Sequence, residues 1–195
     1  AASRVGNPRE GLSLLMRFVN IFPDDPHRPE ALLRAGEAYR KEGNAELALR
    51  LISEAVDSAQ DPGITVRARL AQGGILEDIG RIERARDEYK AVIAAALEPA
   101  PAASALERLL VIERERRGDE GAVLMLASII MRGDPFVREM ARNHFDELIR
   151  TIDPQLQKDP KRAAFFYNLA EDISQVKALS SDARLGAAEL HERVG

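Results

Sequence analysis

The residues of this chain that could do chemistry are few, and the three histidines are the most reactive among them. His27, His144 and His191 lie far apart in the sequence. None belongs to an HExxH motif or to another spacing that is typical of a metal site. The chain contains no cysteine, which excludes disulfides, cysteine-ligated zinc and thiol catalysis. We therefore interpret the histidines as structural and expect neither a metal nor a cofactor.

Two glycine-containing motifs have a chemical and a structural interpretation. Gly73-Gly74 would suit a phosphate-binding loop only between a strand and a helix, and here the pair falls inside a predicted helix, which favours close helix packing. Arg132-Gly133-Asp134 spells an adhesion tripeptide, but it stands before Pro135 and is interpreted as a helix stop. The serines have no paired base in any recognisable motif. The sequence therefore predicts no catalytic residue, and we expect a protein that is not an enzyme.

The amino-acid composition restricts the possible classes of protein further. The chain has 195 residues, of which 45% are hydrophobic and 31% charged, as in folded globular proteins. A net charge of -4 and a pI near 5.5 argue against a nucleic-acid partner. Acidic and basic residues alternate over 113–117, which is typical of a solvated helix face. No apolar run is long enough for a membrane-spanning helix.

Proline, glycine and capping residues divide the chain into helical segments. The sequence predicts helices over residues 8–21, 29–41, 44–58, 65–79, 82–97, 102–117, 120–131, 136–152, 161–176 and 181–194. Residues 153–160, with two prolines, are expected to form a longer connection. The chain is therefore expected to be all-α.

Four apolar columns recur along these helices with a period of 37 residues. The columns are Gly11, Ala48, Ala85, Ala122; Leu15, Ile52, Tyr89, Leu126; Phe18, Ala55, Val92, Ile129; and Val19, Val56, Ile93, Ile130. The small residues of the first column let two helices approach closely, and the large ones fill the space between them. A fixed period of this length indicates one helical unit that is copied and stacked.

Residues 29–60 resemble a tetratricopeptide repeat. The matching positions are Leu32, Ala35, Gly36, Tyr39, Gly43, Ala48, Ile52 and Ala55. The second unit keeps Gly73, Gly80, Ala85 and Tyr89, and the third keeps Leu106, Leu109, Ala122 and Leu126, with Gly118 one residue late. The resemblance implies a right-handed superhelical stack of antiparallel helix pairs, a tetratricopeptide-like α-solenoid. Arg69 and Glu113 depart from the pattern, and the period is 37 instead of 34.

The resemblance also implies a division of the chain. Residues 1–27 are expected to be a partial repeat with its second helix only, and residues 28–134 three repeats of about 37 residues. Residues 135–195 are expected to form degenerate helical repeats, with the last one truncated, because Ala187, Ala188, His191 and Gly195 match a first helix and its turn. We interpret the chain as part of a longer array or of a larger protein.

The resemblance places partner-binding residues on the concave face of such an array. Carried over, they are Glu30, Leu33, Glu37, Arg40 and Lys41 in the first unit, Arg67, Leu70, Gly74, Glu77 and Asp78 in the second, and Glu107, Val111 and Arg114 in the third. The Lys/Asn pattern of the clamp that binds terminal carboxylates in this family is absent, since Leu33 and Glu37 hold two of its sites. An acidic C-terminal tail is therefore disfavoured as the ligand.

We predict a scaffold that binds a peptide or protein along this face, within a larger protein or assembly. The alternative is a helical accessory or regulatory part of an enzyme, for example one that acts on peptidoglycan or the cell envelope. RNA binding, in which each helical repeat recognises one base, is disfavoured by the net negative charge. Self-association through the terminal helices is a further alternative. Residues 18–43 also resemble bacterial envelope repeat proteins, which favours the periplasm or a membrane-associated complex over the cytoplasm without excluding the latter.

Overall fold

The computed structural model describes residues 8–156 and 158–175, and these residues form helices, turns and loops without any β-strand. The helices are α1 (Pro8–Ile21), α2 (Arg28–Lys41), α3 (Ala45–Ser58), α4 (Pro62–Asp78), α5 (Ile82–Ala95), α6 (Pro99–Arg132) and α7 (Pro135–Leu156). Residues 160–175 are also helical. The expected all-α class is confirmed.

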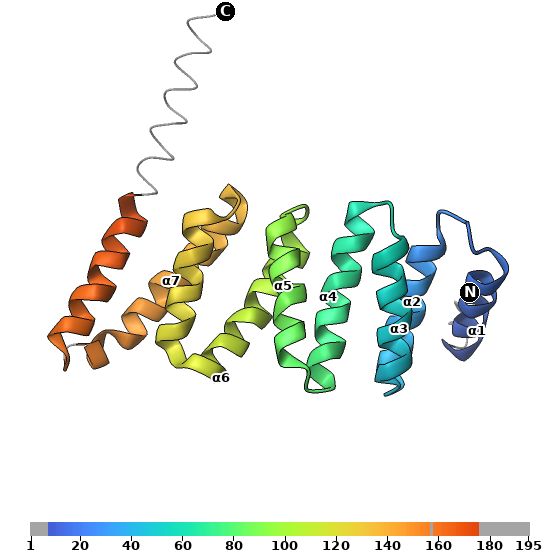
Figure 1. Ribbon diagram of the computed structural model, residues 1–195, viewed down its shortest axis with the longest axis horizontal. Helices are drawn as coiled ribbons and strands as arrows, with labels where there is room; N and C mark the ends of the chain where they lie inside the picture. Colours follow the sequence, from blue (N-terminus) through green and yellow to red (C-terminus); the bar gives the residue numbers. More distant parts are fainter. Residues whose placement is uncertain (1–7, 157, 176–195) are drawn as a thin grey trace, which may run out of the picture. The chain divides into compact units, whose positions relative to one another are not determined.

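The chain divides into two compact units, Ala1–Ile112 and Glu113–Gly195. Within the first unit, α2 packs against α3 and α4 against α5, while α3 also contacts α4. Short turns join these helices, so each neighbour runs antiparallel to the one before it (Figure 1). The first unit is therefore a stack of helix hairpins, each of which buries its apolar stripe against the next.

Glycines with a positive φ end the first helix of each pair. Gly43 and Gly80 have φ values of 81° and 73°, a left-handed conformation that glycine adopts without a side-chain penalty. Gly118, with φ 69° and ψ -176°, interrupts α6 at the corresponding point of the third repeat. Asn44 then begins α3 by accepting a hydrogen bond from the Leu47 amide at 3.3 Å.

Several helix boundaries differ from the sequence-based expectation, among them the end of α5 at Ala95 instead of residue 97 and the start of α6 at Pro99 instead of residue 102. Helix α4 begins at Pro62 instead of residue 65, because the Asp61 carboxylate caps it by accepting from the Gly63 amide at 2.8 Å. Helix α7 continues through Pro154 to Leu156, so part of the predicted connection over 153–160 is helical. A proline near the end of a helix removes only one backbone hydrogen bond. The predicted helix over 181–194 lies outside the described residues.

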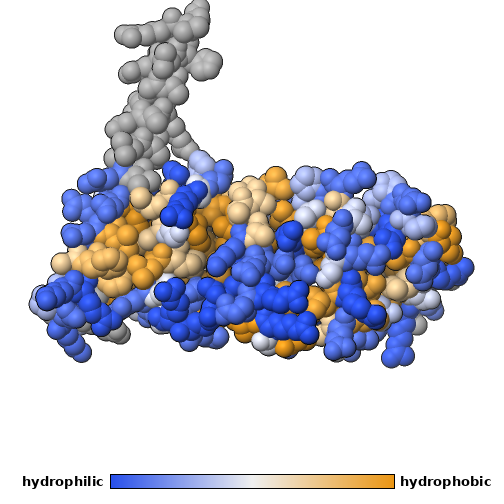
Figure 2. All heavy atoms as spheres, viewed as in Figure 1, coloured by the Kyte–Doolittle hydropathy of each residue, from blue (hydrophilic) through white to orange (hydrophobic). Residues whose placement is uncertain are grey.

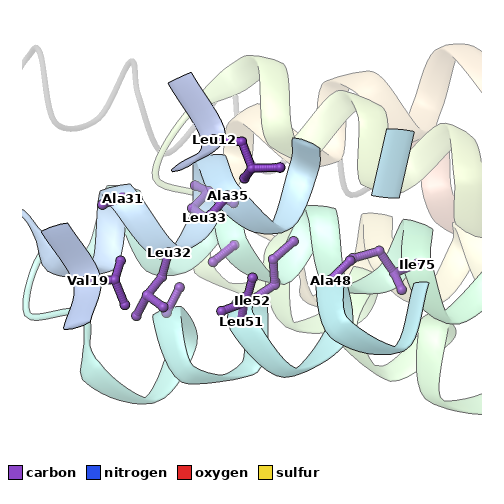
Figure 3. Close-up of a cluster of buried hydrophobic side chains, with 12 residues drawn as sticks. Leu12, Val19, Ala31, Leu32, Leu33, Ala35, Ala48, Leu51, Ile52 and Ile75 are labelled. Atoms are coloured by element: carbon purple, nitrogen blue, oxygen red, sulfur yellow. The ribbon is translucent and has the colours of Figure 1, made fainter. Parts of the chain in front are cut away.

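The apolar columns form the core of the first unit. Ala48 and Ile52 are completely buried, and so is Ala85, while Tyr89 is 1% exposed. Figure 3 shows Ile52 and Leu51 of α3 in the same cluster as side chains from α1, α2 and α4. Column residues of α1 and α3 therefore belong to one apolar cluster, and the equivalent residues of α5 are buried as well.

The second unit has its own buried residues. They are Ala122, Val123, Leu126, Ala127 and Ile130 of α6, Val137, Ala141, Phe145, Leu148 and Ile152 of α7, and Ala163, Phe166 and Ile173 of the following helix. Within the described part of the chain, no helix has both the length and the apolar character needed to cross a membrane.

Candidate functional site

Most of the partner-binding residues predicted in the first and second repeats lie on a surface between α2 and α4, two helices of the first unit that contact each other directly. We call it the α2–α4 surface. One hollow on it is lined by Glu30, Leu33, Arg34, Glu37, Arg40, Arg67, Leu70 and Ala71, and an adjoining one by Glu37, Arg40, Lys41 and Asp78. The helices bring these residues together because equivalent positions of stacked repeats lie side by side.

An ion pair between residues one period apart crosses this surface. The Arg67 guanidinium of α4 donates to the Glu30 carboxylate of α2 at 2.6 Å, and Arg34 donates to the same carboxylate at 2.9 Å. The hydrogen bond from Arg67 is the largest cause that lowers the pKa of Glu30 below its ordinary value. The same bond raises the pKa of Arg67. Both charges are thus already neutralised within the protein.

A second pair ties the same two helices together. Arg40 of α2 donates to both oxygens of the Asp78 carboxylate of α4, at 2.6 and 3.2 Å. Its guanidinium lies over Gly74, where an added Cβ would come within 2.5 Å of the Arg40 Nη1 atom. Gly74 is itself buried and is not available to a partner. Its lack of a side chain leaves room for the Arg40 guanidinium.

Glu77, another predicted partner-binding residue, is largely covered by its own neighbours. Its carboxylate accepts from the Tyr89 hydroxyl at 2.7 Å and from Arg108 at 2.6 Å, and its side chain is 11% exposed. Burial is the main cause that raises the pKa of Tyr89, followed by the bond to Glu77. The ring of Tyr89 packs on Gly73, where a Cβ would lie 2.5 Å from its Cε1 atom.

Two charges of the α2–α4 surface remain available. Glu37 and Lys41 stand one turn apart on α2 and are exposed. Neither forms an ion pair or side-chain hydrogen bond within residues 8–156 and 158–175. Beside them Leu33 is 2% exposed and Leu70 is partly exposed, so an apolar floor adjoins a charged rim.

The predicted residues of the third repeat do not join these contacts in the same way. Glu107 and Val111 are exposed on the first half of α6, and Val111 is 46% exposed although it is apolar. Arg114 belongs to the second unit, where it donates to Asp119 at 2.6 Å. We therefore describe the α2–α4 surface from the first and second repeats alone.

Sequence reasoning missed several residues of the surface. Arg34 and Ala71 line the hollow, and Arg108 holds Glu77. Arg34 stands four residues after Glu30, the spacing at which opposite charges meet on one helix, so its role could have been recognised. No local signal connects Arg108 with Glu77, because their contact depends on how two hairpins stack.

The glycine pair and the adhesion tripeptide have structural surroundings. Gly73 and Gly74 lie inside α4 and each admits a large side chain, as close packing requires. The Arg132-Gly133-Asp134 run ends α6, and the Asp134 carboxylate accepts from the Phe136 amide at 2.9 Å at the start of α7. Both motifs therefore have the structural role that the sequence favours.

The histidines belong to different parts of the chain. His27 stands at the N-cap of α2 without a side-chain cap bond. His144 lies in α7, in the second unit, and is partly exposed. His191 lies outside the described residues. Among the residues that the structure describes, no group of three or more histidine, aspartate or glutamate side chains could hold a metal ion.

The two departures from the repeat pattern are both engaged in ion pairs. Arg69 stands where the pattern has a large apolar residue, and it donates to Glu88 of α5 at 2.8 Å. Glu113 stands where the pattern has tyrosine and is 1% exposed, with Arg117 at 4.0 Å. At both departures an opposite charge thus lies beside the unexpected one.

Figure 2 shows hydrophilic side chains over much of the visible face, with smaller hydrophobic patches between them. The ion pairs described above, Arg40–Asp78, Arg67–Glu30 and Arg108–Glu77, bring both signs of charge together.

Comparison with known proteins identifies the fold. The chain is similar to two crystal structures of nearly identical TPR-like repeats from a Podosopora anserina chain assigned as a kinesin light chain, one of them with a single substitution. The TM-score is 0.54 for both, at 15% and 16% sequence identity. The matches cover 89% and 90% of this chain, and 88% and 89% of the others. No family model matches the sequence, and no curated protein does.

Together these findings define the class. The chain has a TPR-like α-solenoid fold, built from helix hairpins that repeat every 37 residues. At this level of identity the likeness concerns the fold alone. Folds of this kind are helical repeat scaffolds, which present extended surfaces to other proteins.

Proposed function

We propose that this chain is a non-enzymatic interaction scaffold that binds a segment of another protein on the α2–α4 surface. The observation that carries the proposal is the pair of unengaged charges, Glu37 and Lys41, beside the apolar floor of Leu33 and Leu70. A hollow with an apolar base and a few charges at its rim suits recognition of side chains from an extended segment or an amphipathic helix.

The charges on this surface restrict which side chains the ligand can carry. Arg67 and Arg40 are already neutralised by Glu30 and Asp78, so a ligand carboxylate would have to break an existing pair to reach them. Glu37 and Lys41 offer one charge of each sign at a spacing of one helical turn. We infer a ligand that carries a basic and an acidic side chain on either side of an apolar residue.

The test exchanges these two charges. The double variant Glu37→Lys/Lys41→Glu keeps the net charge and breaks none of the described ion pairs. We expect it to weaken partner binding by roughly three- to tenfold per lost contact, since partly solvated charge pairs contribute modestly. Immobilised protein would first identify an interactor by mass spectrometry, and calorimetry with the purified interactor would then compare the affinities.

The chain offers a matched control. Glu46 and Arg50 are exposed on α3 at the same spacing and form no ion pair within the described residues. The exchange Glu46→Lys/Arg50→Glu should leave the affinity unchanged. If Glu37→Lys/Lys41→Glu bound the interactor as tightly as the control variant, the binding site would lie elsewhere. The α2–α4 surface would then be wrong as the proposed site.

The setting of the interaction is part of the same proposal. The likeness of residues 18–43 to bacterial envelope repeat proteins supports an envelope-associated complex. Fractionation of cells that carry a tagged copy tests this, because recovery with the membrane or periplasmic fraction is expected. Recovery in the cytosolic fraction alone would contradict the envelope assignment without affecting the binding surface.

A further inference from the structure

A hollow distinct from the α2–α4 surface lies between two helix connections of the first unit. Its lining comes from the connection between α1 and α2 and from the connection between α3 and α4, which lie at the same end of the hairpins (Figure 1). Its volume is about 470 Å³, within the range of about 300–1,000 Å³ that is usual for ligand pockets. It shares no lining residue with the two hollows of the α2–α4 surface.

Part of the lining is apolar and rigid. Pro23, Pro26 and Pro29 contribute from the first connection and the start of α2, and Ile64 contributes from the start of α4. A proline ring fixes φ of its own residue, so this wall is already ordered before a ligand arrives. An aliphatic chain can therefore pack against it at a small cost in conformational entropy.

Three carboxylates line the same hollow. Asp24 is exposed and forms no hydrogen bond or ion pair within the described residues. Asp25 and Asp61 accept from the backbone amides of His27 and Gly63, both at 2.8 Å, and each uses its Oδ1 atom. No described hydrogen bond reaches the Oδ2 atom of either residue. Each of the three carboxylates thus keeps an oxygen that can accept from a ligand.

The lining contains one basic residue, and its charge is already neutralised. The Arg28 guanidinium donates to the Glu54 carboxylate and, at 3.2 Å, to the Val19 carbonyl oxygen. Its side chain is only 17% exposed. The hollow therefore has an excess of negative charge, which attracts a cationic group.

The acidic character recurs with the period of the array. Asp24 and Asp61 stand 37 residues apart, and Glu98 follows after the same interval. Glu98 lies beside the α3–α4 connection, since a Cβ added to Gly63 would be 3.1 Å from its Oε1 atom. Three successive connections thus carry a carboxylate at the same repeat position, which suits a partner with more than one basic side chain.

The arrangement of the carboxylates selects the kind of cation. Within the described residues, no group of three or more acidic or histidine side chains could hold a metal ion. Acceptors that do not converge on one point suit a flat cation with several N–H donors, and the guanidinium group has five. An arginine side chain also has an aliphatic stem that packs on apolar surface.

We propose that this hollow binds an arginine side chain of a segment of another protein. The guanidinium lies among Asp24, Asp25 and Asp61, and the aliphatic stem packs against the prolines. The contact leaves the ion pairs of the α2–α4 surface intact and does not depend on the proposed function.

The experiment titrates the isotope-labelled chain with Nα-acetyl-L-arginine amide and follows the backbone amides by NMR. The blocked ends of this probe imitate an arginine within a polypeptide. We expect a dissociation constant of about 1–10 mM, as befits a single side chain, with shifts in residues 23–29 and 58–64. Nα-acetyl-L-citrulline amide has nearly the same shape without the charge and should bind at least about threefold more weakly.

Three variants separate charge, shape and general electrostatics. Asp24→Asn/Asp25→Asn should weaken binding of the arginine probe by about three- to tenfold, because two charges are lost while an oxygen remains for the His27 amide. Gln60→Trp fills the hollow without altering a carboxylate and should weaken binding by about tenfold or more. Asp57→Asn, which removes an exposed carboxylate outside the lining, is the matched control and should bind like the unaltered chain.

Several results would overturn the proposal. They are equal affinity for the arginine and citrulline probes, binding that Gln60→Trp leaves intact, and shifts that avoid residues 23–29 and 58–64. Tighter binding of free arginine, whose own carboxylate would face the three acidic side chains, would contradict a protein segment as the ligand. The NMR spectrum of each variant verifies its fold. The exchange Glu37→Lys/Lys41→Glu should not change the affinity for the probe, so failure of the proposed function and failure of this inference give different results.

Discussion

At the scale of single residues, glycine positions decide which side chains can cross from one helix to the next. Gly73 and Gly74 are adjacent in α4 but admit different partners, the Tyr89 ring and the Arg40 guanidinium. One glycine therefore serves packing within a hairpin, and the other serves the contact between repeats. Neither residue needs an unusual backbone conformation, since both lie within a regular helix.

Gly73→Ala should destabilise the protein although alanine is the better helix former. The new Cβ would lie 2.5 Å from Tyr89 Cε1, and the ring cannot easily move because its hydroxyl is bonded to Glu77. Overpacking of about 1–3 kcal/mol outweighs a propensity gain of about 1 kcal/mol. Urea denaturation measures the change. The control Gly11→Ala, where nothing lies within 4 Å of the added atom, should stabilise α1, and equal effects of both would contradict the packing argument.

The Glu30–Arg67 pair predicts a pH dependence. Because Arg67 holds the pKa of Glu30 below its ordinary value of 4.5, the unfolded chain binds the proton first as the pH falls. The stabilisation is thus complete above about pH 4.5 and is lost as the pH drops through the folded pKa. Both side chains are partly exposed, so we expect less than about 1 kcal/mol.

Denaturation curves at neutral and acidic pH would measure this contribution. Glu30→Gln should reduce the loss of stability on acidification, whereas Glu46→Gln, which removes an exposed carboxylate of α3, should not. An acid dependence that is the same in all three proteins would show that the Glu30–Arg67 pair adds nothing to folding.

At the scale of elements, the helix ends set the repeat. Asn44 and Asp61 begin helices by accepting backbone hydrogen bonds, and Gly43 and Gly80 end them with a positive φ. The turn between the two helices of a hairpin is therefore specified locally. The side chains on the helix faces then determine which hairpins stack.

Gly118→Ala tests the interruption of α6, where the non-helical residue lies inside the helix instead of in a turn between two helices. With φ 69° and ψ -176°, Gly118 adopts a conformation that is essentially restricted to glycine. An alanine there should cost about 1–3 kcal/mol or force α6 to continue as one straight helix. Thermal unfolding measures the cost, with Gly11→Ala as the control. A Gly118→Ala variant as stable as the parent would mean that the bend is not required by the fold.

At the scale of the whole molecule, each repeat contacts mainly its neighbours. Stability in such arrays is a sum of repeat terms and neighbour terms, so a defect remains local. The separation of the chain into Ala1–Ile112 and Glu113–Gly195 agrees with this view. A repeat array differs in this respect from a globular domain, in which one core links all elements.

Ile52→Ala tests that locality. Ile52 is completely buried in α3, and its truncation should cost about 2–5 kcal/mol. Hydrogen exchange should accelerate in α2, α3 and α4, because these helices contact one another, but not in α7. Uniform acceleration along the chain would indicate one cooperative unit and contradict the repeat-by-repeat account.

The sequence by itself determined the helices and their repeat, because both depend on local signals. Capping residues and turn glycines act within one hairpin, and the apolar columns recur at a fixed spacing of 37 from one hairpin to the next. The patterns of Ala48 and Ile52 or of Gly43 and Gly80 could therefore be interpreted without a structure. Among the boundaries that differed, the one at Pro62 depends on a single cap and the one around Pro154 on a proline near a helix end.

Only the tertiary structure decided which candidate residues are available to a partner. Arg40, Arg67 and Glu77 look like exposed charges in the sequence, yet their partners Asp78, Glu30 and Arg108 lie on a neighbouring hairpin. Glu37 and Lys41 have the same residue types and remain unengaged within the described chain. A local pattern cannot distinguish these cases, because ion pairs between stacked repeats depend on distances that no single helix specifies.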